Sequence, residues 1–329
     1  MKMPGKRLLL VTLVVPLSMF AGCDRHSKSE QYFLIATNID LPYWQTAHAG
    51  FSKAAAEYGV TEFMHGPDTF NPSVEVDEFR SAVAKKPAGI LVSVSDPRLM
   101  GPAINEAIAA GIPVITMDSD APDTQRLYFI GTHNLEAGRL GGERVAAELN
   151  GKGNVVFFTM PAQPNLEERL KGYKDVFANF PGIKIVEVFD MKGESGTAMD
   201  KAREYLARTG PAKINAYICL EASAGKDVAQ AFKRSNAQGS MLMAMDVDQE
   251  TLKLIKDGTI QATISQKPYT MALLGLKALD DLHHYPLHPL ARDYGSDATS
   301  PIPAFVDTGV SLVDKSNVDK YLAHPAQTP

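Results

Sequence analysis

The stretch Pro113-Val-Ile-Thr-Met-Asp118-Ser-Asp120-Ala-Pro122 decides the fold. Its apolar residues after Pro113 have the character of a buried β-strand, and that strand runs directly into two carboxylates before Pro122 ends the element. In an open α/β sheet, ligands bind outside the carboxyl ends of the strands. An aspartate at such a position is a poor core residue but is well placed to face a ligand. The stretch therefore predicts an α/β sheet with a binding site at the end of this strand.

The same arrangement occurs twice more. Met243-Ala-Met-Asp246 again ends in a carboxylate, and Thr263-Ile-Ser-Gln266 ends in an amide. Capping of the next helix is the alternative role for each aspartate, since Asp is a common N-cap. We favour a ligand role, because a carboxylate accepts charge-assisted hydrogen bonds from hydroxyl groups and an amide both donates and accepts. We therefore expect Asp118, Asp246 and Gln266 to meet in one pocket to which two sheets contribute residues.

Other side chains near strand ends extend this candidate site. Tyr43 and Trp44 follow the first strand and a proline, where flat rings suit the apolar face of a sugar. Trp44 also fits the buried stripe of its helix, so a core role is the alternative. Glu221 follows another apolar strand and is expected to face the pocket. Arg169 lies early in a helix. The sequence is equally consistent with an Arg169 side chain that reaches the cleft and with one that pairs with neighbouring acidic residues.

Strand and helix patterns alternate along most of the chain. The alternation runs from Gln31 to Asn150, restarts at Asn154 and continues to Leu282. It predicts parallel sheets with helices on both faces, and two runs of about 100 to 130 residues predict two doubly wound domains. Residues 283–303 are rich in Pro, Gly, Ser and Asp and are interpreted as a loop. Strand character returns over residues 304–313, which we interpret as a crossing between the domains.

The composition and the missing motifs limit the class of protein. The chain has 329 residues, of which 45% are hydrophobic and 22% charged, and this allows two folded cores. Its net charge is -5 and it has no long basic run, so we expect no nucleic acid partner. Neither a Gly-x-Ser-x-Gly elbow nor a P-loop occurs, and Gly151-Lys-Gly153 precedes a strand instead of following one. We therefore expect no cofactor.

Two clusters resemble metal sites only weakly. Asp246-Val-Asp248-Gln-Glu250 lacks the turn glycine and the ligand spacing of a calcium loop, and we interpret Asp248 as a helix N-cap. His283, His284 and His288 lie in a proline-rich segment without a nearby carboxylate, so we interpret them as solvated loop histidines. The sequence therefore predicts no metal site.

The N-terminus has the parts of an export signal. Basic residues precede an apolar region over residues 8–21, which is short for a membrane span and contains a proline. Phe20-Ala21-Gly22-Cys23 resembles a bacterial lipobox, with Phe20 in place of the usual leucine. We expect residues 1–22 to be a signal peptide, Cys23 to be lipidated and residues 23–30 to form a tether. An ordinary signal peptide with an incidental Cys23 is the alternative.

The sequence contains one other cysteine, Cys219. If Cys23 is acylated, no intrachain disulfide can form, and an exported protein without disulfides relies on its cores. Cys219 lies in the apolar run Ala216-Tyr-Ile-Cys-Leu220, so we expect it to be a small buried hydrophobic residue.

Several of these motifs together resemble the periplasmic sugar-binding proteins of the ribose-binding type, which are the soluble components of ABC importers. The resemblance extends from Gln31 to about Val313. The motifs that carry it are Pro42-Tyr43-Trp44, Gly111-Ile-Pro-Val-Ile-Thr-Met-Asp118, Gly131-Thr-His-Asn134, Glu168-Arg169-x-x-Gly172-Tyr173, Met245-Asp246 and Gly258-x-Ile-x-Ala-Thr-Ile-x-Gln266.

The resemblance implies a type I periplasmic binding protein, with two Rossmann-like lobes that close on one sugar. It implies that Tyr43 and Trp44 stack on the ring and that the polar groups at the strand ends bond its hydroxyls. The implied N-terminal lobe comprises residues 31–131 and 267–304, and the C-terminal lobe comprises residues 132–266 and 305–329. Three crossovers are implied, near Gly131-Thr132, Gln266-Lys267 and Phe305-Asp307.

Three departures from the ribose type concern the ligand. Ribose binders have arginine where this chain has Ser119 and Glu167, and asparagine where it has Glu221. We expect Ser119 and Glu221 to face a ligand in a cleft with more negative and fewer positive groups. The sequence therefore predicts a ligand other than ribose, which is another sugar or polyol, or a cationic or amino-substituted solute.

We thus expect a monomeric solute-binding protein, anchored by lipid in the periplasm or at the cell surface, which closes on its solute and delivers it to a membrane permease. One alternative is that the closed form signals to a chemoreceptor or a sensor kinase. Another is an enzyme that uses Asp118 and Asp246 as an acid-base pair, which requires two carboxylates with different pKa values. We favour a protein without enzymatic activity.

Overall fold

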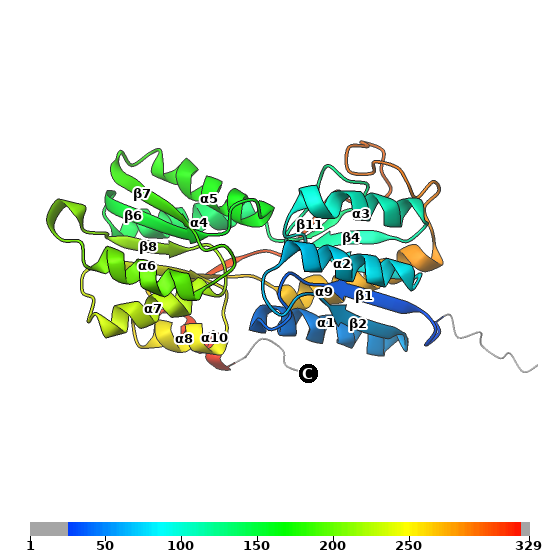
Figure 1. Ribbon diagram of the computed structural model, residues 1–329, viewed down its shortest axis with the longest axis horizontal. Coiled ribbons are helices and arrows are strands. Elements are labelled where there is room, and N and C mark those ends of the chain that lie inside the picture. Colours follow the sequence, from blue (N-terminus) through cyan, green and yellow to red (C-terminus); the bar gives the residue numbers. More distant parts are fainter. Residues whose placement is uncertain (1–25, 324–329) are drawn as a thin grey trace, which may run out of the picture.

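The computed structural model describes residues 26–323 as two α/β lobes, each built on a six-stranded sheet. The lobes lie side by side, and the segments that connect them pass through the middle of the molecule (Figure 1). The predicted signal peptide and Cys23 lie outside the described residues. Within residues 26–323, no helix combines the length and the apolar character that crossing a bilayer requires.

The first lobe has an all-parallel sheet in the order β11-β5-β4-β3-β1-β2. Its strands are β1 (Gln31–Ile35), β2 (Thr61–His65), β3 (Gly89–Val92), β4 (Val114–Met117), β5 (Phe129–Gly131) and β11 (Phe305–Asp307). Its helices are α1 (Pro42–Tyr58), α2 (Pro72–Ala84), α3 (Pro97–Ala109) and α9 (Pro268–His284).

The second lobe has the order β12-β10-β9-β8-β6-β7, and only β12 is antiparallel to its neighbour. Its strands are β6 (Lys152–Thr159), β7 (Gly182–Asp190), β8 (Ala216–Cys219), β9 (Met241–Met245), β10 (Ala262–Ser265) and β12 (Ser311–Asp314). Its helices are α4 (Asn134–Glu148), α5 (Pro164–Phe177), α6 (Gly196–Leu206), α7 (Ala224–Arg234), α8 (Gln249–Lys256) and α10 (Val318–Ala323), with a short 3-10 helix at Gly210–Ala212. The predicted doubly wound fold class is confirmed.

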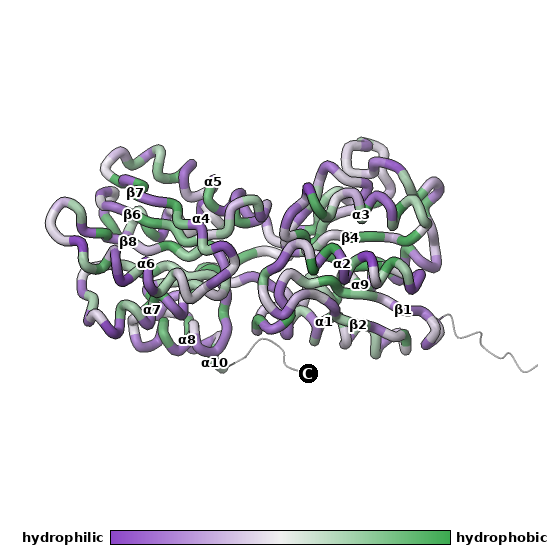
Figure 2. Tube along the Cα trace, in the orientation of Figure 1, coloured by the Kyte–Doolittle hydropathy of each residue, from purple (hydrophilic) through white to green (hydrophobic). Residues whose placement is uncertain are grey.

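The central strands lie within the hydrophobic cores. Every residue of β3, β4, β8 and β9 is buried, as expected for parallel strands that helices cover on both faces. Hydropathy colouring shows a hydrophobic β4 and mixed colours along the helices that cover the sheets (Figure 2). Cys219 in β8 is 1% exposed, which confirms that it is a small buried residue.

Three segments cross between the lobes, and two lie where the resemblance placed them. Residues 132–133 connect β5 to α4, and residues 266–267 connect β10 to α9. The predicted third crossover was wrong by a few residues, because Phe305–Asp307 pairs with β5 in the first sheet. The chain crosses at residues 308–310 instead. The apolar pattern was continuous, but Gly309 has a φ of 79° and separates two strands that belong to different sheets.

The histidines near residue 284 also differ from the prediction. Helix α9 continues through His283 and His284, so neither lies in a loop. The His284 side chain is 16% exposed and contacts the carboxylates of Glu30 and Asp280, so its assignment as a solvated histidine was wrong. His283 and His288 are exposed. Glu30 is distant in sequence from α9, which is why the sequence did not reveal this contact.

Small residues let α4 and α5 approach closely. A Cβ atom at Gly138 of α4 would lie 2.0 Å from the Arg169 carbonyl oxygen, and one at Gly172 of α5 would lie 2.2 Å from the Leu135 carbonyl oxygen. Both of these atoms belong to the helix backbone, so they cannot move away as the end of a flexible side chain can. The two glycines therefore fix the position of α5, the helix that carries Arg169.

We expect Gly138→Ala to lower the free energy of unfolding by about 2 kcal/mol, because the added methyl group forces the helices apart. Gly196→Ala on α6 is the matched control, since a Cβ atom there meets nothing within 4 Å. It should leave stability unchanged or raise it by up to about 1 kcal/mol. Urea denaturation measures both values, and equal losses would contradict close packing as the cause.

Candidate functional site

A cavity of about 50 Å³ lies between the lobes, at the carboxyl ends of strands from both sheets. Seven of the eight predicted ligand-facing residues line it; Ser119 does not. The seven are Tyr43, Trp44, Asp118, Arg169, Glu221, Asp246 and Gln266. Residues that are far apart in the sequence meet here because the carboxyl ends of the two sheets face each other.

Asp118 holds the first-lobe side of the site. Its backbone has a φ of 61°, a left-handed conformation that Asp tolerates better than most residues. Its carboxylate accepts hydrogen bonds from the Tyr43 hydroxyl at 2.7 Å, the Ser93 hydroxyl at 3.3 Å and the Asn165 amide at 3.2 Å. Asn165 belongs to the second lobe, so this contact connects the lobes. Burial raises the pKa of Asp118, although the positive charge of Arg169 opposes the shift.

Asp246 occupies the corresponding position in the second lobe, with a φ of 68°. It accepts a hydrogen bond from the Gln266 amide at 2.9 Å. Burial raises its pKa to about 7, and Arg169 again opposes the shift. The N-cap of helix α8 is instead Asp248, as predicted. Its carboxylate accepts hydrogen bonds from the backbone N–H groups of Glu250 and Thr251.

Arg169 lies at the centre of this network and is 3% exposed. Its guanidinium donates to the Asn134 side-chain oxygen at 2.9 Å, the Leu220 carbonyl at 2.9 Å and the Gln266 side-chain oxygen at 2.8 Å. The two alternatives from the sequence are thus resolved in favour of the cleft. Gln266 also accepts from the Thr132 hydroxyl at 2.9 Å, so two crossing segments meet at its side chain.

Glu221 has a local structural role besides its position at the cavity. It lines the cavity, but its carboxylate oxygens accept from the backbone N–H groups of Ser223 and Ala224, both at 2.7 Å, at the start of α7. A hydrogen bond to a ligand therefore competes with this local role. Glu167, which the resemblance associated with the cleft, is exposed and accepts from the Ala162 backbone at 2.9 Å.

Ser119 and Asp120 do not line the cavity. The chain turns tightly after Asp118, with the Ser119 N–H bonded to the Met117 carbonyl, and the Ser119 side chain is fully buried. Its expected ligand-facing position is therefore not supported. Asp120 pairs with Arg126 through two hydrogen bonds of 2.6 and 2.7 Å. The second carboxylate of the stretch Pro113–Pro122, that of Asp120, therefore forms a structural ion pair.

The two aromatic residues differ in their surroundings. The Tyr43 hydroxyl bonds Asp118, and the ring is partly buried beside the cavity. Trp44 is 2% exposed and belongs to the core of the first lobe, although it also lines the cavity. The rings contact edge to face, with centroids 5.2 Å apart. Both readings of Trp44 from the sequence thus apply, since it belongs to the core and also lines the cavity.

Sequence reasoning missed two polar residues of the second lobe. Gln163 and Asn165 lie between β6 and the first turn of α5, and both line the cavity. They are 5% and 4% exposed, and the Gln163 side-chain oxygen has no partner among the described residues. Neither directly follows the last residue of β6, and Asn165 lies inside α5, so the rule that selected Asp118 from the position after its strand does not find them.

Comparison with known proteins identifies the family. The family model for the periplasmic binding protein domain matches residues 32–283. This chain belongs to that family. A xylose/arabinose-binding protein of Sulfolobus acidocaldarius is 23% identical and aligns over 93% of this chain and 76% of its own length.

Solved structures of periplasmic binding proteins agree with this assignment. The sugar-binding protein of a sugar ABC transporter from Bacillus halodurans is 32% identical, with a TM-score of 0.77 over 89% of this chain and 100% of that one. A solute-binding protein from Burkholderia graminis in complex with D-arabinose is 27% identical, with a TM-score of 0.80 over 89% and 98%. Members of this family are substrate-binding proteins that act outside the cytoplasm, and they are not enzymes.

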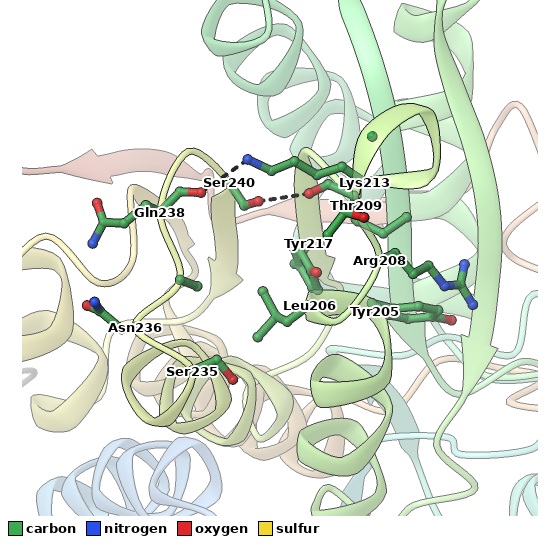
Figure 3. A pocket seen from close by; sticks show the side chains of 13 residues that line it. Tyr205, Leu206, Arg208, Thr209, Lys213, Tyr217, Ser235, Asn236, Gln238 and Ser240 are labelled. Carbon is green, nitrogen blue, oxygen red and sulfur yellow. Dashed lines mark hydrogen bonds between the residues drawn. The ribbon is translucent and has the colours of Figure 1, made fainter.

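The second lobe of this periplasmic binding protein has another cavity, of about 300 Å³. It lies at the amino ends of β8 and β9, opposite the end that faces the first lobe (Figure 3). Its lining includes Tyr205, Arg208 and Tyr217, and Lys213 bonds the Gln238 carbonyl across its rim. The larger volume does not make it the better candidate, because the groups that converge from both lobes are at the interlobe cavity.

The raised pKa of Asp246 predicts a pH-dependent stability. Between the ordinary aspartate pKa of 3.8 and the folded value of about 7, the folded chain binds more protons than the unfolded chain. The free energy of unfolding should therefore fall as pH rises through this window, by up to about 4 kcal/mol from this group.

We expect Asp246→Asn to remove this contribution, so the variant should gain stability relative to wild type between pH 4 and pH 8. Asp200→Asn serves as the control, since that side chain is 76% exposed and contacts Arg203 at the surface. Urea denaturation without added solute at both pH values tests the expectation. A gain for Asp200→Asn equal to that for Asp246→Asn would contradict it.

Proposed function

We propose that this chain binds a sugar or polyol between its lobes and delivers it to an ABC permease in the membrane. The supporting observation is the convergence of Asp118, Asp246, Arg169 and Gln266 from both lobes on one buried cavity with an aromatic border. Hydroxyl-rich solutes need several acceptors and donors together with a flat apolar surface. The names of the relatives, a xylose/arabinose-binding protein and a sugar transporter component, agree with this chemistry.

Each side chain has a proposed role in holding the solute. The carboxylates of Asp118 and Asp246 accept hydrogen bonds from hydroxyl groups, and Arg169 and Gln266 orient them. The rings of Tyr43 and Trp44 border the apolar side of the solute. Gln163 and Asn165 add amide groups from the second lobe. Glu221 contributes negative charge and keeps its cap on α7, whereas Ser119 does not line the cavity and is assigned no contact with the solute.

Binding requires the lobes to separate. A cavity of about 50 Å³ is far smaller than the roughly 300 Å³ at which ligand pockets begin. The Asn165 contact with Asp118 joins the lobes across this cavity, so it must break when a solute enters. The three crossing segments provide the hinge. We propose that the permease recognises the form in which the lobes have closed on the solute.

The charges at the cavity support a solute other than ribose. Three carboxylates, those of Asp118, Asp246 and Glu221, border it together with one guanidinium, that of Arg169. A second candidate is therefore an amino-substituted sugar, whose cation would offset the excess negative charge.

A calorimetric titration with pentoses, hexoses, polyols and an amino sugar tests both candidates. We expect one sugar or polyol to bind one site with a micromolar or lower Kd. Tightest binding of ribose would overturn the ligand argument, and binding of none would overturn the function. Chemical turnover of the bound sugar would favour the rival acid-base enzyme. Signalling to a sensor kinase, with no stimulation of a reconstituted permease, would favour the receptor alternative.

We also propose that the protein is a monomer that a lipid on Cys23 holds to the membrane. The lipobox-like Phe20-Ala21-Gly22-Cys23 supports the anchor. Fractionation of cells that express the full chain tests it, because Cys23→Ser should move the protein from the membrane fraction to the soluble fraction. Wild-type protein in the soluble fraction would contradict the anchor.

A further inference from the structure

Two imidazoles and two carboxylates meet at the end of the first lobe that is remote from the cleft. His26 and Glu30 precede β1, and Asp280 and His284 lie in the last turns of α9. His26 Nε2 lies 2.9 Å from Asp280 Oδ2, and His284 Nε2 lies 3.2 Å from Glu30 Oε2 and 3.6 Å from Asp280 Oδ1. The candidate ligand atoms of His26, Asp280 and His284 all lie within 4.8 Å of one another.

The charges in this cluster are not balanced by lysine or arginine. Asp280 is 2% exposed, and the Glu30 side chain is 13% exposed. Within residues 26–323, the ion-pair partners of both carboxylates are histidines. Burying a carboxylate is costly unless a cation or several hydrogen bonds compensate it. A divalent cation between the four side chains would supply that compensation.

The distances fit a small tetrahedral cation. Zinc binds histidine nitrogen and carboxylate oxygen at about 2.0 to 2.2 Å, which places neighbouring ligand atoms of a tetrahedron about 3.3 Å apart. The separations of 2.9, 3.2 and 3.6 Å lie around this value. The ligand atoms of His26, Asp280 and His284 spread over as much as 4.8 Å, so their side chains would rotate towards one another to centre the ion. The ligand types also match, since imidazole and carboxylate are common zinc ligands.

The surrounding residues orient the ligands. The Tyr32 hydroxyl donates to Asp280 Oδ1 at 3.1 Å. The His26 ring stacks on Tyr58 with centroids 4.8 Å apart, and it meets the His284 ring edge to face at 5.0 Å. Such supporting contacts preorganise a metal site, because they fix ring orientation before the ion binds.

We propose that His26, Glu30, Asp280 and His284 bind one zinc ion. The ion connects the segment before β1 to the last turns of α9 and so fastens the start of the folded chain to the first lobe. The site lies beside the amino end of β1, whereas the proposed sugar site lies at the carboxyl ends of the strands. Zinc binding is therefore a property separate from sugar binding. This proposal replaces the expectation from the sequence that the chain has no metal site.

The test uses the purified full chain without a histidine tag, stripped with a chelator and titrated with zinc sulfate in a calorimeter. We expect one zinc ion per chain and a higher melting temperature with zinc. His26→Ala and His284→Ala should each weaken zinc binding by about a hundredfold or more. His283→Ala is the matched control, since His283 is the exposed neighbour of His284 on the same helix, and it should change the Kd less than about twofold.

Glu30→Gln and His26→Ala alter the segment before β1, so they keep the test decisive if a change in α9 impairs folding. Circular dichroism of each zinc-free variant checks that it is folded. Absence of zinc binding by the wild-type chain would overturn the proposal. So would a Kd that His26→Ala, His284→Ala and Glu30→Gln all leave unchanged, or a loss in His283→Ala as large as in His284→Ala.

Discussion

Asp118→Asn is expected to weaken sugar binding about a hundredfold and to leave the protein at least as stable as wild type. A hydrogen bond to a charged group contributes about 1.5 to 3 kcal/mol, and each 1.4 kcal/mol changes the Kd tenfold. The carboxylate can accept from several hydroxyl groups, whereas the amide has one acceptor oxygen. Stability should not fall, because burial raises the pKa of Asp118 and the substitution removes a buried charge that is costly to desolvate.

Asp120→Asn is the matched control, since it changes the same residue type two positions later. Asp120 bonds the guanidinium of Arg126, which is 8% exposed, and it does not line the cavity. We expect the Kd to change less than about twofold and the free energy of unfolding to fall by about 3 kcal/mol, because Arg126 loses its buried partner. Calorimetry and urea denaturation separate the two variants. A loss of affinity in both would show that the turn, and not the Asp118 carboxylate, determines binding.

The positions of Asp118 and Asp246 could be predicted because they depend on a simple rule. Buried parallel strands have continuous apolar sequences, and the first polar residue after each strand lies at the edge where ligands bind. Both residues have positive φ values and side chains that make no helix cap, so their local sequence and their site role agree. The rule does not find Asn165, which lies in the first turn of α5 and still reaches the same cavity.

Other features depend on contacts that the sequence does not contain. Glu221 satisfies the rule but also caps α7, and the choice between these roles depends on the geometry of the next turn. The strand character of residues 304–313 did not show that its two halves join different sheets. His284 was predicted to be solvated because Glu30, its partner, is far away in the sequence. Long-range pairing decided the last two cases, whereas local turn geometry decided the role of Glu221.

Arg169→Met is expected to cause the largest combined loss of stability and affinity. Arg169 is 3% exposed and donates to three acceptors, in Asn134, Leu220 and Gln266. Removing it takes a donor from all three, although Gln266 keeps its bond from the Thr132 hydroxyl. Each acceptor that is left unpaired costs about 1 to 3 kcal/mol without simple additivity. We expect the free energy of unfolding to fall by about 3 to 5 kcal/mol and the Kd to rise more than a hundredfold. Urea denaturation and calorimetry measure the two effects.

Arg139→Met is the control for losing an arginine from the same lobe. The Arg139 side chain is 40% exposed and pairs with Glu136 and Asp175 at the surface, so its loss should cost less than about 1 kcal/mol and leave the Kd unchanged. Arg169→Lys should be intermediate, because an ammonium group keeps the charge but cannot reproduce the planar fork of a guanidinium. If Arg169→Met bound sugar as tightly as Arg139→Met, the central role of Arg169 would be wrong.

The effect of Arg169 on affinity should also depend on pH, and the loss of affinity in Arg169→Met should be larger at lower pH. Its positive charge lowers the pKa values of Asp118 and Asp246, which burial raises. Without it, both pKa values rise further, so a smaller fraction of each group is the carboxylate that accepts two or more hydroxyl donors. The Kd of Arg169→Met should therefore improve towards higher pH over a range where the wild-type value is already constant. One guanidinium thus orients the amide at the crossing and lowers the pKa of both acids, which gives a physical reason for a buried arginine between two lobes whose facing edges are acidic.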